Sequence, residues 1–393
     1  MDKSSLNRRN FLRLGAAATA GFAAGGKQTV SAAKVSPGMG NDKEIITRDL
    51  GNTGIKVPIV SMGVMRADNP NILKGAYELG ITHFDTAHGY QDGRNEEMVG
   101  NFFKDKPRDS FVIATKIHPE KGDSTDDFLE MFDKSLKRLQ MDFVDILYLH
   151  AVEDEEYMMN ENFLKAMKKA KEQGKAKHVG ISTHTNMADV INLAVDSDFY
   201  EVVLTSFNFR HADDEALNNA MKRAHDAGIG LVGMKNMAGG YLDEEKTKPV
   251  NAKAALKWAL SHPYMHTCIP GIVSYDMLQE NWAVATDVDL SPDEKEDLEL
   301  ALNETGLFCK GCNGCAGQCK YGLPIPDLMR SYMYNYGYTY PAKARETVAS
   351  LGISDNPCAD CLECTVSCRS GFDVKNRVTN IARIQNVPSE FLV

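Results

Sequence analysis

Four polar residues stand out because each lies at, or just after, the C-terminal end of an apolar run. The residues are Asp85, Tyr90, Lys116 and His150. The runs read HFDTAHGY at 83–90, FVIATKI at 111–117 and DFVDILYLH at 142–150. Buried parallel strands are near-continuous apolar runs of this kind, and catalytic groups at the C-terminal ends of parallel strands are typical of a (β/α)8 barrel. The spacing therefore predicts a catalytic site at the mouth of a barrel.

The four residue types suit the reduction of a carbonyl or the oxidation of an alcohol. A carbonyl that accepts a hydride becomes an alkoxide and needs a proton at the same moment. A tyrosine has an ordinary pKa of about 10, and a lysine ammonium beside it favours the phenolate and lowers that pKa. We therefore expect Lys116 to activate Tyr90, Asp85 to hold Lys116 charged and oriented, and His150 to direct a donor at the substrate oxygen.

The elements that must position these residues alternate between strand and helix patterns, as a parallel barrel requires. Strands are expected at 59–64, 82–86, 111–117, 142–150, 178–183, 202–208, 229–235 and 266–271. Helical spacing of apolar residues marks 124–139, with a start at Ser124, and a capped helix at 291–304 is expected to close the barrel. The predicted fold class is α/β, a (β/α)8 TIM barrel over residues 44–305.

These motifs resemble the aldo-keto reductase superfamily, over roughly residues 46–286. The segment RDLGNTGIKVP (48–58) is similar to the family's opening hairpin. The resemblance implies that Asp85, Tyr90, Lys116 and His150 are the catalytic tetrad, and that NAD(P)H is the cofactor. In VGIST (179–183), Ser182 matches a nicotinamide-binding serine, whereas Thr183 stands where asparagine is usual and Leu204 where glutamine is usual.

The segment IPGIVSYDMLQEN (269–281) is similar to the family's phosphate-binding segment. Glu280 and Asn281 match the adenine contacts, but Gly271 and Met277 replace the two cations that hold a 2′-phosphate in many members. A phosphate needs paired charge, so a preference for NADP over NAD is doubtful. Lys235 stands where a small polar residue is common; it is expected either to reach a phosphate or substrate carboxylate, or to be an exposed lysine.

The charge balance excludes some classes of partner. The chain of 393 residues has 44 Lys and Arg against 54 Asp and Glu, a net charge of −10. Residues 1–33 contain five of the basic residues and one of the acidic ones, which leaves 39 against 53, or −14, without them. Such a balance argues against binding to nucleic acid or to anionic membranes.

The N-terminus, residues 1–33, is interpreted as a signal peptide. NRRNFLR (7–13) resembles a twin-arginine signal, the apolar part that follows is too short to span a bilayer, and Ser31-Ala32-Ala33 offers small residues for cleavage. We therefore expect export by the twin-arginine route, to the periplasm or another compartment outside the cytoplasm, and no membrane span once the signal is removed.

Eight of the nine cysteines lie after residue 308, in two runs with the spacing C-x2-C-x2-C-x3-C. The first run is Cys309, Cys312, Cys315 and Cys319, and the second is Cys358, Cys361, Cys364 and Cys368. This spacing is typical of two [4Fe–4S] clusters, each bound by three cysteines of one run and the fourth of the other. Structural zinc and disulfides, which exported proteins use, are the alternatives.

The cysteine region resembles bacterial two-cluster ferredoxins over about residues 306–385. The resemblance implies a small α+β ferredoxin-like domain, for which we take residues 306–393. Lys320 and Arg369 follow the fourth cysteines where proline is usual, and the connecting segment 320–357 is long and rich in tyrosine. Cluster pairing is therefore less firmly predicted than cluster binding.

Two hypotheses follow for the whole chain. The first is an exported oxidoreductase acting on a small carbonyl or alcohol and exchanging electrons through its clusters with a redox partner protein. The second is an iron–sulfur electron carrier or binding protein that uses a catalytically silent barrel as a scaffold. Three residues after barrel strands, His184, Phe209 and His211, are expected either to line the mouth or to pack in the core.

Overall fold

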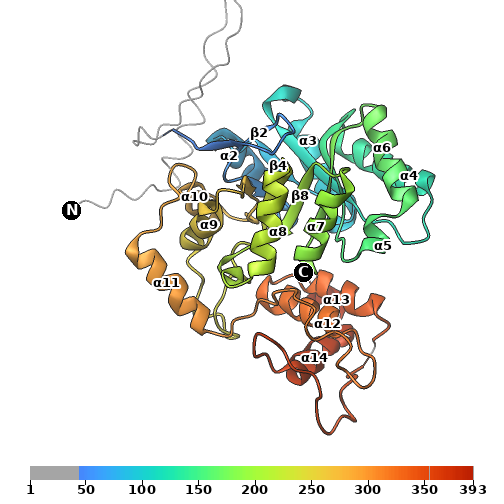
Figure 1. The fold of residues 1–393 in the computed structure, drawn as a ribbon, viewed down its shortest axis with the longest axis vertical. Coiled ribbons are helices and arrows are strands. Elements are labelled where there is room, and N and C mark those ends of the chain that lie inside the picture. The colour runs from blue at the N-terminus through green and yellow to red at the C-terminus, as the bar shows by residue number, and fades with distance from the viewer. Residues whose placement is uncertain (1–43, 354, 393) are drawn as a thin grey trace, which may run out of the picture. The chain divides into compact units, whose positions relative to one another are not determined.

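Eight short parallel strands form a ring, with helices arranged around it (Figure 1). The computed structural model describes residues 44–353 and 355–392, so the predicted signal peptide lies outside the described residues. The strands of the ring are β3 (Met62–Gly63), β4 (His83–Asp85), β5 (Val112–Ile117), β6 (Val144–Leu149), β7 (Ala176–Thr183), β8 (Val202–Ser206), β9 (Gly230–Met234) and β10 (Thr267–Cys268). All eight predicted strands are confirmed.

The strands pair in chain order from β3 to β10. Two isolated parallel bridges, Val60 with Cys268 and Gly63 with Gly271, join the first strand region to the last and close the ring. The predicted opening hairpin is also present, with β1 (Thr47–Asp49) paired antiparallel to β2 (Lys56–Pro58). Leu50 and Val57 from this hairpin are fully buried and join the apolar cluster that fills the interior of the ring.

The helices that surround the ring bury one apolar face each against the strands. They are α2 (Pro70–Leu79), α3 (Arg94–Phe103), α4 (Thr125–Leu139), α5 (Glu155–Met158), α6 (Glu161–Glu172), α7 (Met187–Ser197), α8 (Glu215–Asp226), α9 (Ala252–Ser261), α10 (Tyr275–Trp282) and α11 (Pro292–Asn303). Helix α4 starts as predicted, with a reciprocal capping box between Ser124 and Asp127. Helix α11 has the same device between Ser291 and Glu294.

The C-terminal part differs from the prediction. Its described residues form helices α12 (Ile325–Tyr332), α13 (Pro341–Ser350) and α14 (Val374–Ala382), with a π-helical turn at Met333–Gly337, and no strand. The α+β expectation is therefore corrected to an all-helical arrangement. The physical reason is the spacing in the connecting segment, where Ile325, Leu328, Met329 and Tyr332 share one buried helical face.

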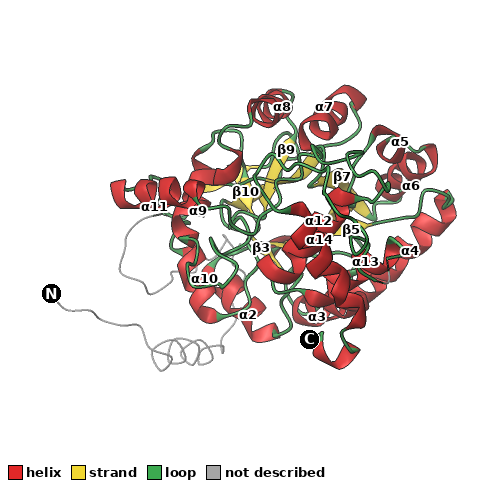
Figure 2. Cartoon of the chain, turned by 90° about the horizontal axis from the view of Figure 1, so that it is seen from below, coloured by secondary structure: helices red, strands yellow, loops and turns green. Residues whose placement is uncertain are grey.

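The C-terminal helices lie across the C-terminal end of the strands. Seen from below, α12, α13 and α14 stand in front of the strand ring (Figure 2). One apolar cluster is common to both parts, because Phe209 and Ala238 of the barrel pack in it with Leu328 and Val378 of the tail. Backbone contacts join residues 45–393 into one unit, and the boundary at residues 305 and 306 stays a prediction.

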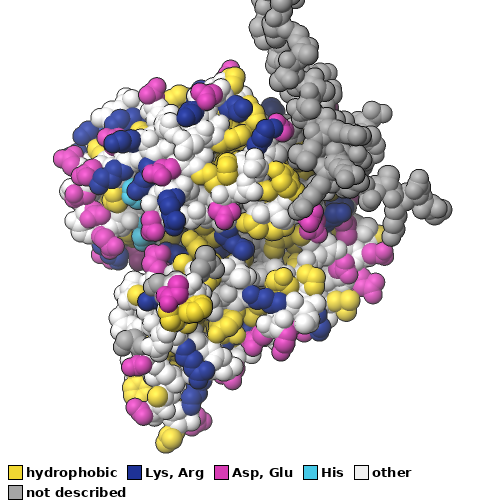
Figure 3. Space-filling view, turned by 180° about the vertical axis from the view of Figure 1, so that it is seen from behind, with side chains coloured by type: hydrophobic (Ala, Val, Ile, Leu, Met, Phe, Trp, Pro, Cys, Tyr) yellow, Lys and Arg dark blue, Asp and Glu magenta, His cyan; other side chains and the backbone are white. Residues whose placement is uncertain are grey.

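On the face of the molecule shown in Figure 3, acidic and basic side chains are interspersed. Within the described residues, none of the helices combines the length and the apolar character that crossing a bilayer requires.

Candidate active site

Lys116 and Asp85 form a buried ion pair at the C-terminal ends of neighbouring strands. The Lys116 Nζ donates to Asp85 Oδ1 at 2.5 Å and to the Thr86 carbonyl at 2.6 Å. Both side chains are nearly inaccessible, with 1% and 3% of their surface exposed. Because β4 and β5 pair in parallel, the two residues meet as the sequence predicts.

Tyr90 reaches the same pair from the loop after β4. Its Oη lies 3.4 Å from the Lys116 Nζ, and the ammonium lies 4.9 Å from the centroid of its ring. The loop is strained, because Gln91 and Asp92 have φ of 52° and 55°. The Gln91 side chain holds it by donating to the carbonyls of Met65 and Ala67. Sequence alone gives the tyrosine but not this conformation.

His150 completes the group. It follows β6, its ring centroid lies 5.8 Å from that of Tyr90, and the planes are nearly perpendicular at 79°. Its backbone is fixed by a bond from its N–H to the Ile117 carbonyl, and by His118, whose ring donates to the His150 carbonyl at 2.7 Å. Burial, with Lys116 next, holds the pKa of His150 well below its usual value. The imidazole is therefore neutral at pH 7 and donates through a single ring nitrogen.

The expectation that Lys116 lowers the pKa of Tyr90 is wrong for this structure. Burial raises that pKa well above its usual value, and the charges of Asp85 and Tyr340 add to the rise. The reason is that Asp85 offsets the charge of Lys116 at close range, while the mouth is buried under the tail. The phenol is therefore protonated throughout the neutral range.

The residues predicted to hold the nicotinamide ring are only partly suited to it. Ser182 is buried at the end of β7, where its Oγ accepts from the Ala151 N–H at 2.9 Å and keeps its own proton to donate. The Thr183 hydroxyl is already committed to the Thr185 carbonyl at 2.8 Å. Leu204 is fully buried in the apolar interior of the ring. One of the three positions thus offers a free polar group.

The residues predicted to hold the adenosine end follow the last strand of the ring. Gly271 is exposed just after β10, and Glu280 is exposed and Asn281 buried on the outer helix α10. Met277, on the same helix, offers no charge to a 2′-phosphate.

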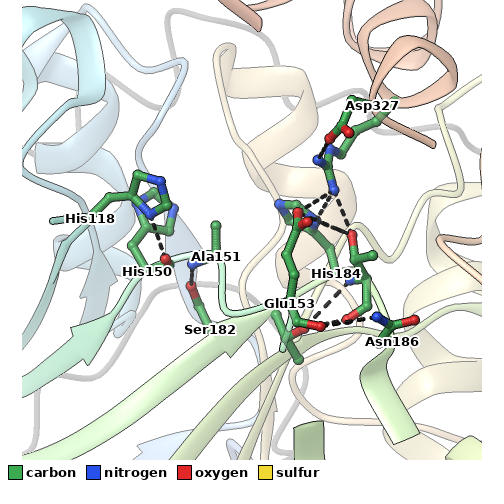
Figure 4. A network of polar contacts seen from close by, with 11 residues as sticks. His118, His150, Ala151, Glu153, Ser182, His184, Asn186 and Asp327 are labelled. Atoms are coloured by element: carbon green, nitrogen blue, oxygen red, sulfur yellow. Dashed lines mark hydrogen bonds and ion pairs between the residues drawn. The ribbon is translucent and has the colours of Figure 1, made fainter. Parts of the chain in front are cut away.

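A polar network that the sequence does not reveal joins the tail to the barrel loops beside His150 (Figure 4). Arg330, on α12, pairs with Glu153 Oε1 at 2.7 Å, donates to Thr185 Oγ1 at 2.5 Å and contacts His184 Nδ1 at 3.3 Å. Asp327 pairs with the same guanidinium from within α12. Because Glu153 and Thr185 follow β6 and β7, this network ties the tail to the loop that carries His150 and to the loop after the strand that carries Ser182.

The tyrosine-rich part of the tail also reaches the mouth. The Lys235 Nζ, at the end of β9, lies 5.1 Å from the centroid of the Tyr334 ring. Burial raises the pKa of Tyr334 to about 12, and Tyr90 is among its electrostatic neighbours. The sequence marks this segment only by its composition, so its position over the site could not be predicted.

The other three residues considered for the mouth differ in their positions. His184 lines a cavity between the barrel and the tail. By contrast, His211 closes a capping box with Asn208, and Phe209 is buried in the apolar cluster shared with the tail. His211 and Phe209 are thus packing residues.

The eight tail cysteines line two cavities, four in each. The first cysteine cavity is lined by Cys309, Cys312, Cys315 and Cys368, together with barrel residues His184, Thr185, Ser206 and Lys235. The second cysteine cavity is lined by Cys319, Cys358, Cys361 and Cys364 and by tail residues alone. Each cavity thus takes three cysteines from one run and the fourth from the other.

The two runs are held together by side chains as well. Gln318 Nε2 donates to the Gly314 carbonyl, while its Oε1 accepts from the Ser367 N–H at 2.7 Å. The nine cysteines, all within the described residues, are free thiols, so the disulfide alternative is not seen. Among the described residues, no three His, Cys, Asp or Glu side chains are grouped closely enough to hold a single metal ion.

Residues 60–254 match the aldo/keto reductase family. The chain is 27% identical over 300 residues to L-galactose dehydrogenase of Arabidopsis thaliana, covering 65% of this chain and 92% of that protein. It is 33% identical over 158 residues to L-glyceraldehyde 3-phosphate reductase of Escherichia coli (strain K12), covering 35% of this chain and 45% of that one.

Among solved structures, the chain is similar to an aldo-keto reductase from Bacillus halodurans in its holo form, with a TM-score of 0.56 and 22% identity, over 66% of this chain and 96% of that one. A thermostable aldo-keto reductase in complex with epalrestat gives a TM-score of 0.54 and 24% identity, over 65% and 100%. These likenesses support the barrel fold alone. The matched segment and the sequence relatives show an oxidoreductase with an aldo/keto reductase domain over residues 60–254.

Proposed function

We propose that this protein is an exported oxidoreductase that interconverts a small carbonyl and its alcohol at the barrel mouth and exchanges electrons through two [4Fe–4S] clusters in its tail. The observation that carries the proposal is the grouping of the cysteines. Three cysteines of one run and the fourth of the other line each cavity, and the first cysteine cavity is shared with residues of the barrel mouth.

The barrel residues have separate tasks in this proposal. Tyr90 holds a proton on its Oη and donates it to the oxygen of a reduced carbonyl, because its raised pKa keeps it protonated. Lys116 orients the phenol from 3.4 Å, and Asp85 fixes Lys116. His150, neutral beside Tyr90, directs an N–H at the substrate oxygen and stabilises the negative charge that develops there.

A nicotinamide cofactor fits this site in part. When bound, it would supply the hydride for the carbonyl. Ser182 would donate to its carboxamide, and Glu280 and Asn281 would contact the adenosine end. Gly271 and Met277 give no charge for a 2′-phosphate, so the residues favour NAD(H) over NADP(H).

Cluster ligation fits the cysteine cavities. The soft thiolates of Cys309, Cys312, Cys315 and Cys368 would hold one cluster, and those of Cys319, Cys358, Cys361 and Cys364 the other. Clusters supply one-electron transfer, and an alcohol differs from its carbonyl by two electrons and two protons. Two one-electron groups therefore match one turnover, with a redox partner protein as the external donor or acceptor.

Export of the protein in its folded state would be compatible with cluster binding, because clusters inserted inside the cell would remain bound during export. The twin-arginine pattern at Arg8 and Arg9 is the basis of this part. We expect the mature chain to start near Lys34, which N-terminal sequencing of the exported protein measures.

The test is anaerobic purification of the mature protein, followed by iron, sulfide, zinc and bound-nucleotide analysis of one sample. We expect about eight iron and about eight acid-labile sulfide atoms per chain, the content of two [4Fe–4S] clusters. Zinc without sulfide would overturn the proposal for the tail. Reduction of the clusters by an accepted alcohol, seen by their loss of visible absorbance, is the expected sign of coupling between barrel and tail.

A further inference from the structure

Lys235 is held in a strained backbone conformation at the end of β9. Its φ is 57°, a left-handed value that a lysine adopts only where its surroundings impose it. The surroundings do so here through its carbonyl, which accepts from Asn208 Nδ2 at 3.0 Å and from the Ala238 N–H at 3.1 Å. The strain fixes the direction in which the side chain leaves the strand.

The side chain has no ion-pair partner among the described residues, although Glu153 is one of its electrostatic neighbours. Its Nζ lies 5.1 Å from the centroid of the Tyr334 ring. Removing an ammonium from water without a partner is unfavourable. A half-buried lysine ammonium without a carboxylate partner points to an anionic group that occupies the space beside it.

That space is the first cysteine cavity. Lys235 lines it together with Cys309 and Cys368, and the Cys309 sulfur is an electrostatic neighbour of the ammonium. Ser206, at the end of β8, lines the same cavity with 2% of its surface exposed. Its buried Oγ has no hydrogen-bond partner among the described residues. A cation and an unused hydroxyl of the barrel thus face the four sulfurs of the tail.

We propose that Lys235 sets the reduction potential of the cluster held in the first cysteine cavity, and that the Ser206 hydroxyl donates a hydrogen bond to the same cluster. The inference rests on the proposed function and adds to it a role for the barrel in the redox chemistry of the tail. Four thiolates around a cube give an anion, and reduction adds one electron and one unit of negative charge. A fixed ammonium therefore stabilises the reduced form more than the oxidised form.

The second cysteine cavity lacks this contribution, because its lining comes from the tail alone. It has a cation of its own in Lys375, whose Nζ donates to the Cys361 carbonyl. Lys235 should consequently raise the potential of one cluster and leave the other nearly unchanged.

The test is a redox titration of the anaerobically purified mature protein, followed by electron paramagnetic resonance, which reports the potential of each cluster without turnover. Lys235→Met removes the charge and retains the length of the side chain. We expect it to lower one of the two midpoint potentials by at least about 59 mV, which is about tenfold in a one-electron equilibrium constant. Lys235→Arg should restore the potential, and Ser206→Ala should lower the same one by less.

Lys375→Met is the matched control, since it removes a cation beside the second cysteine cavity and should move the other potential. If Lys235→Met retains the iron and sulfide of the wild type and leaves both potentials unchanged, the inference is overturned while the proposed function stands. If it instead raises KM for an acidic substrate with both potentials unchanged, Lys235 binds substrate and the inference is again overturned. Absence of iron and sulfide from the wild type would remove the proposed function and this inference together.

Discussion

The chemistry of the barrel mouth is set by which charges are already paired. Lys116 lies beside Tyr90, yet its nearest partner is Asp85 at 2.5 Å, and both members of that pair are buried. The phenol is therefore surrounded by a neutralised pair and by apolar burial, and its pKa is raised. Tyr90 therefore carries the proton that carbonyl reduction needs, whereas the phenolate that alcohol oxidation needs is scarce.

This leads to a difference between the two directions of reaction. Tyr90→Phe should lower kcat for carbonyl reduction by about 10²- to 10⁴-fold, the usual contribution of a general acid. With the wild type, the reduction rate should not fall as pH rises from about 7 to about 9, because the phenol stays protonated. Alcohol oxidation needs the phenolate and should accelerate over the same range. Steady-state rates against pH measure both.

Tyr77→Phe is the matched control for the first effect, because Tyr77 lies on the outer helix α2 and its hydroxyl donates to Ser110, which precedes the N-terminal end of β5. A reduction rate that Tyr90→Phe leaves unchanged would contradict the assignment of the proton donor. A reduction rate that falls through pH 8 with a single titration would contradict the raised pKa.

For the individual residues, the sequence predicts which side chains form the site better than it predicts their surroundings. The identities and order of Asp85, Tyr90, Lys116 and His150 suffice to bring them together, because parallel strands place their C-terminal ends at one edge. The rise in the pKa of Tyr90 comes first from burial, then from Asp85 and from Tyr340, which lies 250 residues away in the chain. No local pattern shows how deeply the phenol is buried, so the direction of the shift could not be predicted.

Between the barrel and the tail, the loop that carries the first cysteine run packs closely against the loop after β7. The Asn186 N–H donates to the Gly311 carbonyl at 3.3 Å. A Cβ on Gly311 would lie 2.1 Å from the His184 carbonyl oxygen, and the glycine also has a left-handed φ of 67°. Only glycine allows the two backbones to approach this closely.

Gly311→Ala should consequently separate the cysteine loop from the barrel. Gly317→Ala is its matched control, because Gly317 has a similar φ of 69° but nothing within 4 Å of an added Cβ. Both variants carry the strain of a left-handed alanine, and Gly311→Ala adds a steric clash of about 1–3 kcal/mol. The free energy of unfolding from urea titrations should fall more for Gly311→Ala. Equal losses in the two variants would contradict the close contact.

Helices and strands could be predicted where a residue pattern is compatible with a single structure. Eight apolar runs separated by amphipathic segments indicate a parallel barrel, and Ser124 and Ser291 mark the starts of two helices because their side chains cap the helix. The tail is different, because cysteine spacing constrains ligands and says nothing of the segment between them. In helix α12, Leu328, Met329 and Tyr332 lie on one face. This pattern can be recognised once the barrel surface that these residues cover is known.

In the whole molecule, buried histidines make the free energy of unfolding depend on pH. Burial lowers the pKa of each of His83, His211 and His266 to about 4, from an ordinary value of 6.5. The folded protein therefore binds these protons less readily than the unfolded chain does. The contribution to stability is fully present above about pH 6.5 and is lost as pH falls towards 4.

We expect the free energy of unfolding to decline steeply between about pH 6.5 and about pH 4, by up to about 3 kcal/mol for each histidine. Urea titrations at a series of pH values measure the slope. His83→Gln removes one of these contributions, so its slope should be shallower than that of the wild type. A stability that is flat over this interval would show that these histidines are solvated in the folded protein.

The crossing of the fourth cysteines also dictates an order of assembly. On the assignment proposed above, Cys368 completes the ligand set that begins at Cys309. Each cluster would therefore gain its full set of ligands only after the second run has been synthesised. A premature stop after the first run would forfeit both metal centres, although that run alone contains four thiols in the expected spacing.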